Sequence, residues 1–139
     1  MAVINKKITG FQVKTESVET LNETTDRPET MTGSTYKITP TSLDSALYIT
    51  INNIELNGKR RPYEIFINTK SVEAFEWVTI FTRLVSAVWR NGGNYDFLTK
   101  EMLATFAPNG GYFQKGHGYI PSLVAHIGII IEGHLKGLA

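Results

Sequence analysis

The chain has no cysteine among its 139 residues. This absence excludes disulfide bonds, thiolate metal sites, iron–sulfur clusters and a catalytic thiol or thiyl radical within the chain itself. Histidine and carboxylate chemistry remains available, but no carboxylate pair and no Ser/His/Asp set stands out along the sequence. We therefore predict no catalytic residue, and we expect the chain to act by binding.

A large excess of charge of one sign is also missing, because 14 Lys and Arg residues face 13 Asp and Glu residues. The resulting net charge of +1 gives no overall field that would draw the chain to nucleic acid or to an anionic membrane. No apolar run approaches the ~20 residues needed to span a bilayer, and the N-terminus lacks a signal-peptide pattern. We expect a cytoplasmic protein that binds neither a membrane nor nucleic acid.

Apolar residues make up 42% of the chain, which is enough for one sizeable core. We predict an N-terminal strand within residues 1–15, a flexible linker or loop at 16–33, and a single α+β domain at 34–139. The linker prediction depends on a polar composition, rich in Thr and Glu, that buries too little apolar surface to offset the entropy of ordering.

Strands are predicted where apolar residues alternate with polar ones, at residues 35–39, 46–52 and 61–68. Asn57 and Gly58 lie between the last two strands and favour a tight hairpin turn. These strands should form one antiparallel sheet with a half-exposed face.

Beyond residue 70 the apolar spacing changes to that of helices. We predict a core helix at 71–90 with Trp77 and Leu84 on its buried face, a shorter helix at 95–106, a glycine-rich loop at 107–118, and a last helix that begins at Pro121. Strands first and helices afterwards indicate an α+β fold with about three helices packed on one face of the sheet.

The last helix carries His126 and His134, with Glu132 nearby. Two ligands eight residues apart on a helix are separated by about 12 Å along its axis, too far to share one ion. We therefore expect no metal site.

Exposed side chains rich in hydrogen-bonding groups are the best candidates for contact with a partner or ligand. Two arginines near the predicted hairpin turn can grip a carboxylate or phosphate, and the glycine-rich loop offers backbone amides. The predicted site residues are Arg60, Arg61, Gly110, Gly111, Lys115 and His117.

An alternative interpretation places single-stranded nucleic acid at the hairpin tip. Lys59, Arg60 and Arg61 would supply charge there, and the aromatic rings of neighbouring strands would supply stacking surface. Those rings belong to Tyr48, Tyr63 and Phe66. Three charges at a turn are more typical of a solvated tip, which is the interpretation we favour.

Several segments along nearly the whole chain resemble one enzyme family. They include Gly33-Ser34-Thr35-Tyr36-Lys37-Ile38 and Arg90-Asn91-Gly92-Gly93, and the others are at 27–29, 46–52, 60–68, 75–77, 84–88, 110–113 and 119–123. The chain is similar to the small subunit of split, vitamin-B12-dependent (class II) ribonucleotide reductases. Equivalent sequence occurs at the C-terminus of single-chain enzymes of this class, as a domain named for a Thr-Ser-Cys-Pro-Asp motif. The matching stretch here, 118–122, keeps the proline as Pro121 and has no cysteine.

The resemblance implies an accessory role in deoxyribonucleotide synthesis for DNA replication. The large subunit of such a reductase holds adenosylcobalamin, the radical cysteine and the nucleotide sites, so this chain would bind no cofactor and would not catalyse alone. Its expected partner is that large subunit, a nucleotide is a second candidate ligand, and self-association stays open. The alternative is a freestanding interaction protein, for example one encoded by a phage, that binds a nucleotide or a regulatory target.

Overall fold

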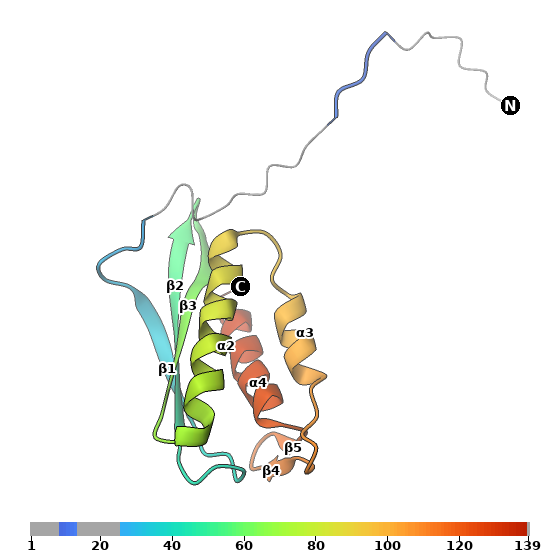
Figure 1. The fold of residues 1–139 in the computed structure, drawn as a ribbon. Coiled ribbons are helices and arrows are strands. Elements are labelled where there is room, and N and C mark those ends of the chain that lie inside the picture. Colours follow the sequence, from blue (N-terminus) through green and yellow to red (C-terminus); the bar gives the residue numbers. More distant parts are fainter. Residues whose placement is uncertain (1–8, 14–25, 139) are drawn as a thin grey trace, which may run out of the picture.

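The computed structural model describes residues 9–13 and 26–138. Three strands form an antiparallel sheet in the order β1 (Thr32–Ile38), β2 (Leu47–Leu56) and β3 (Lys59–Thr69). Helices follow the sheet along the chain and lie on one of its faces (Figure 1). The predicted α+β class is confirmed.

The turn between β2 and β3 confirms the hairpin predicted from two residues. Asn57 and Gly58 both have positive φ angles, 51° and 75°, which is the backbone conformation that a two-residue hairpin turn requires. Leu56 and Lys59 pair directly on either side of it. Further along the same pair of strands, the register shifts at a bulge beside Asn53.

Three helices follow: α2 (Val72–Asn91), α3 (Phe97–Leu103) and α4 (Leu123–Lys136). Helix α3 is shorter than the predicted 95–106. Helix α4 does not begin at Pro121, because the side chain of Ser122 accepts a hydrogen bond from a backbone amide of the first turn and so forms the N-cap.

A second, small hairpin, formed by β4 (Tyr112–Gln114) and β5 (Gly118–Ile120), begins within the segment 107–118 that was predicted as a glycine-rich loop and extends two residues beyond it. Gly111 precedes this hairpin and lies directly against β5. A Cβ atom at Gly111 would lie only 1.9 Å from the carbonyl oxygen of Ile120, so glycine is required there by close approach.

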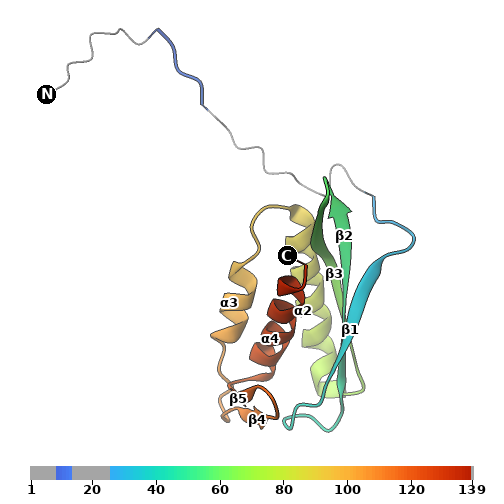
Figure 2. The same cartoon turned by 180° about the vertical axis from the view of Figure 1, so that it is seen from behind.

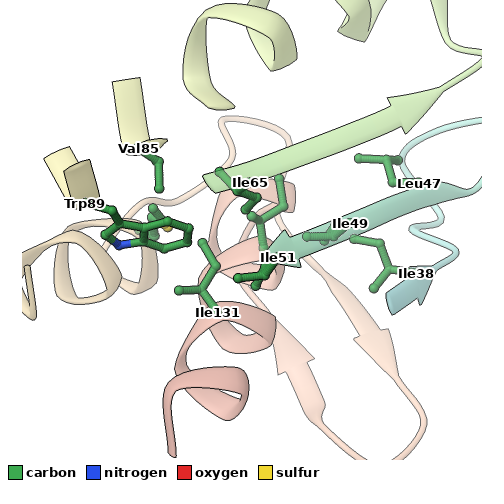
Figure 3. Packing of buried hydrophobic residues seen from close by; sticks show 10 residues of the cluster. Ile38, Leu47, Ile49, Ile51, Ile65, Val85, Trp89 and Ile131 are labelled. Carbon is green, nitrogen blue, oxygen red and sulfur yellow. The ribbon is translucent and has the colours of Figure 1, made fainter. Parts of the chain in front are cut away.

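The core lies between the sheet and the helices (Figure 3). Trp89 of α2 is 1% exposed and packs with isoleucines of the sheet and of α4. Trp77, predicted to lie on the buried face of this helix, is only partly buried. Leu84, also predicted to be buried, is 60% exposed because no element among the described residues covers its side of α2.

The predicted N-terminal strand does not form over its described part. Residues 9–13 belong to no strand, and Phe11 is 91% exposed, since no described strand pairs with this segment. Residues 1–8 and 14–25 lie outside the described part, and with them most of the predicted linker. The linker boundary at residue 33 is wrong by two residues, because β1 begins at Thr32.

The molecule has two distinct ends (Figures 1 and 2). The β2–β3 turn and the C-terminal ends of α2 and α4 lie at one end, and the β4–β5 hairpin and the start of α4 lie at the other. The sheet face opposite the helices carries no covering helix in the part of the chain that the structure describes.

Candidate functional site

The six predicted site residues do not form one site. Arg60 and Arg61 lie at the start of β3, beside the C-terminal ends of α2 and α4. The other four belong to the β4–β5 hairpin and the turn before it. Helix α4, with 14 residues and a length of about 21 Å, runs between the two groups.

Arg61 is a structural residue. Its Nη2 donates a hydrogen bond of 2.9 Å to the backbone oxygen of Trp89, and its guanidinium lies 5.3 Å from the ring centroid of Tyr95. A cation at the C-terminal end of a helix also interacts favourably with the helix dipole. Arg61 therefore fastens the end of α2 to the sheet.

Arg60 is exposed and lines a small cavity of about 200 Å³. The floor of this cavity is a chain of three buried or half-buried polar groups, Tyr36, Asn53 and His134. Of the two arginines, Arg60 is the one whose side chain is available to a partner.

The amides of the glycine-rich loop are engaged within the protein. The amide of Gly110 donates to the backbone oxygen of Ala107 at 3.1 Å, and the amide of Gly111 donates to the hydroxyl of Tyr119 at 3.1 Å. Lys115 and His117, at the hairpin tip, are exposed. A ligand at the β4–β5 hairpin would therefore contact exposed side chains and not the backbone amides of Gly110 and Gly111.

Both histidines of α4 are buried and paired with tyrosines. The hydroxyl of Tyr36 lies 2.7 Å from Nδ1 of His134, and the hydroxyl of Tyr112 lies 2.7 Å from Nδ1 of His126. Each pair ties a strand to α4. Among the described residues no group of three His, Asp or Glu side chains is placed to hold a metal ion.

The second ring nitrogen of His134 fixes its tautomer. Nε2 lies 2.8 Å from Oδ1 of Asn53, which can only accept, so Nε2 carries the hydrogen and Nδ1 accepts from Tyr36. Burial lowers the pKa of His134, with Arg60 adding to the effect, and burial with the nearby His117 lowers the pKa of His126. Burial also raises the pKa of Tyr112 to about 12. These groups are neutral at physiological pH.

A second polar cluster lies on the opposite face of the sheet. Glu64 of β3 is 3% exposed and receives two hydrogen bonds from Arg27, of 2.7 and 2.9 Å, and one of 2.8 Å from Asn52. The hydrogen bonds from Arg27 hold the pKa of Glu64 below its ordinary value, against the opposing effect of burial. The carboxylate is therefore charged and fully partnered.

An apolar groove of about 330 Å³ separates α2 from α3. Leu84 is 60% exposed on its wall, and Ile80 is 53% exposed one turn earlier on α2. Exposed apolar surface that is gathered in one place is typical of an interaction site. The residues that line this groove are Phe81, Leu84, Val85, Val88, Leu98, Glu101, Met102, Thr105 and Val124.

The open face of the sheet was missed by sequence reasoning as a site of its own. Tyr48 and Phe66 are 44% and 50% exposed on it, away from the basic tip to which we had joined them. Tyr63, the third ring of that interpretation, is 4% exposed. The alternation itself carries the signal, because Tyr48 and Phe66 lie one position out of phase with the buried residues Ile49 and Ile65.

Comparison with known proteins gives one family. The model of the TSCPD domain matches residues 14–135, which is most of the chain. No curated protein and no solved structure matches. In the part of the chain that the structure describes, no helix is both long enough and apolar enough to cross a membrane.

Proposed function

Because the chain belongs to the TSCPD domain family, found in proteins associated with ribonucleotide reductase, we propose that it is an accessory, non-catalytic subunit of an adenosylcobalamin-dependent ribonucleoside-diphosphate reductase. The family match over residues 14–135 is the observation that carries the proposal. The lack of cysteine supports a non-catalytic role, because a thiyl radical and a reducing dithiol both require that residue.

In this proposal the large subunit holds adenosylcobalamin and performs the reduction. This chain contributes a docking surface, which we assign to the groove between α2 and α3. Apolar side chains that are exposed in the free chain, such as Leu84 and Ile80, would be buried by the large subunit. Burial of one leucine-sized side chain contributes about 1.5–3 kcal/mol.

The test is a binding titration between this chain and the large subunit of a class II reductase, followed by calorimetry, with nucleotide reduction assayed in parallel. We expect Leu84→Glu to weaken binding at least tenfold, because it places a charge in an apolar contact. Val72→Glu is the matched control, since Val72 is 90% exposed on the same helix and does not line the groove.

Failure of the unmodified chain to bind the large subunit would reject the accessory role and favour a freestanding interaction protein. Equal losses for Leu84→Glu and Val72→Glu would reject the groove as the docking surface and leave the accessory role standing. The Arg60→Ala variant, assayed in the same titration, tests the exposed arginine predicted from the sequence.

A further inference from the structure

Two aromatic residues are neighbours on the face of the sheet that no described helix covers. Tyr48 of β2 pairs with Asn68 of β3, and Phe66 of β3 pairs with Thr50 of β2. Tyr48 and Phe66 are therefore diagonal neighbours on one face, and the Cα atoms of such a pair are roughly 7 Å apart. Their exposed fractions of 44% and 50% leave much of each ring open to solvent.

The surface around these rings is hollowed on two sides. A groove of about 310 Å³ runs along the free edge of β3, between that strand and α2, and a second cavity of about 410 Å³ lies beside Tyr48. Asn68 lines both cavities and therefore lies between the two hollows. The side-chain amide of Asn68 offers both donors and an acceptor at their junction.

The groups that surround the rings are mainly cationic. Arg83 and Arg90 of α2 line the edge groove, about 10 Å apart along the helix, Lys70 lines the second cavity, and Lys37 lies 6.0 Å from the ring centroid of Tyr48. None of these four cations forms an ion pair within the part of the chain that the structure describes.

Among the described residues, Glu64 is the one acidic residue that lines either cavity, and its charge is already compensated. Arg27 forms an ion pair with it at 2.7 Å. The local balance is therefore clearly positive, although the whole chain carries a net charge of only +1. Positive charge beside exposed aromatic rings makes this surface suited to an extended anion that carries flat rings of its own.

We propose that this face, defined by Tyr48, Phe66, Asn68, Arg83 and Arg90, binds single-stranded nucleic acid. Successive bases would stack on the two rings, and the cations along the edge groove would contact the phosphates. Asn68 would donate to and accept from base edges. A duplex should bind more weakly, because its bases are stacked on one another and cannot stack on these rings. A mononucleotide should also bind more weakly, because it can contact only one ring and one or two of the cations.

The proposal is tested by fluorescence anisotropy of labelled single-stranded oligothymidine with the full chain. If all four cations contact phosphates, raising the salt from about 50 to about 200 mM weakens binding roughly 50-fold. Tyr48→Ala and Phe66→Ala should each weaken binding roughly 5- to 150-fold. Replacing Arg83 and Arg90 together by Ala should reduce the slope of log affinity against log salt by about 1.4.

Matched controls carry the same chemistry away from this face. Phe113→Ala removes a ring that is 79% exposed on β4, and the pair Lys59→Ala and Lys100→Ala removes two exposed cations from the tip and from α3. These variants should bind like the parent, and the melting temperature of each variant shows that it folds.

Lack of binding at low salt, equal losses in the controls, equal affinity for duplex, or equal competition by thymidine monophosphate would each overturn the proposal. The accessory role is tested separately, by the titration with a reductase large subunit and by Leu84→Glu in the groove between α2 and α3.

Discussion

The two buried histidines make the stability of the fold depend on pH. Both His126 and His134 have a pKa below the ordinary value of 6.5 in the folded chain. Between the lowered value and about pH 6.5, the unfolded chain therefore binds protons that the folded chain does not, so stability falls as the pH falls through this window. The slope reaches at most about 1.4 kcal/mol per pH unit for each histidine, or about 2.7 for both.

Urea unfolding at a series of pH values from about 7.5 to about 5 measures this slope. In His134→Gln the maximum slope should be about half that of the parent, since one of the two histidines remains. The carboxylate of Glu64 does not interfere, because its lowered pKa places its own loss of stability at more acidic pH. A stability that stays constant down to about pH 5 would show that neither histidine is held neutral by the fold.

Neighbouring residues of one predicted site have different roles in the structure. Arg60 and Arg61 are identical in chemistry and adjacent in sequence, yet one side chain is exposed and the other is bonded to the end of α2. Alternation along β3 predicts that they point to opposite faces. It does not predict that the backbone oxygen of Trp89 lies within hydrogen-bonding distance of Arg61, because that contact depends on how α2 packs on the sheet.

At the scale of elements, the features that depend on local chemistry were predicted and those that depend on packing were not. The two residues Asn57 and Gly58 are enough to predict the hairpin turn. The spacing of apolar residues along 72–91 is enough to predict the long helix α2. Strands β4 and β5 have only three residues each, too few for alternation to identify them. Gly111, which permits their pairing, has the same appearance in the sequence as a loop glycine.

The packing of α3 on α4 depends on a glycine, which gives a prediction for these two elements. A Cβ atom at Gly128 would lie 2.8 Å from Cβ of Met102, too close for the helices to keep their present separation. Gly128→Ala should therefore destabilise the protein by about 1–3 kcal/mol, the usual range for overpacking.

Gly133 on the same helix is the matched control, because a Cβ atom there meets nothing within 4 Å. Gly133→Ala should stabilise the protein by about 0.5–1 kcal/mol, since alanine favours the helix. Thermal and urea unfolding of both variants measure the difference. Equal effects of the two substitutions would contradict close packing of α3 on α4.

At the scale of the whole molecule, the fold places apart residues that the sequence pattern groups together. Arg60 and Arg61 are predicted from the sequence to form one site with four residues of 110–117, because both segments are rich in hydrogen-bonding groups. Helix α4, which is about 21 Å long, runs between them, and its direction relative to the sheet is a tertiary property. The apolar groove and the aromatic sheet face likewise require the knowledge that all three helices lie on one side of the sheet.

An ion pair between residues far apart in the sequence links the segment before β1 to the far strand of the sheet, and it gives the last prediction. Arg27 and Glu64 are 37 positions apart, and Glu64 is almost fully buried. Arg27→Ala should lower the urea midpoint at neutral pH, because it leaves a buried carboxylate with Asn52 as its remaining hydrogen-bond donor. Adding Glu64→Gln to Arg27→Ala removes the unpaired charge and should recover much of the lost stability. Glu64→Gln alone should cost less than Arg27→Ala, because the guanidinium that loses its partner is exposed to solvent. If the double variant is no more stable than Arg27→Ala, the buried charge of Glu64 is not what Arg27 compensates.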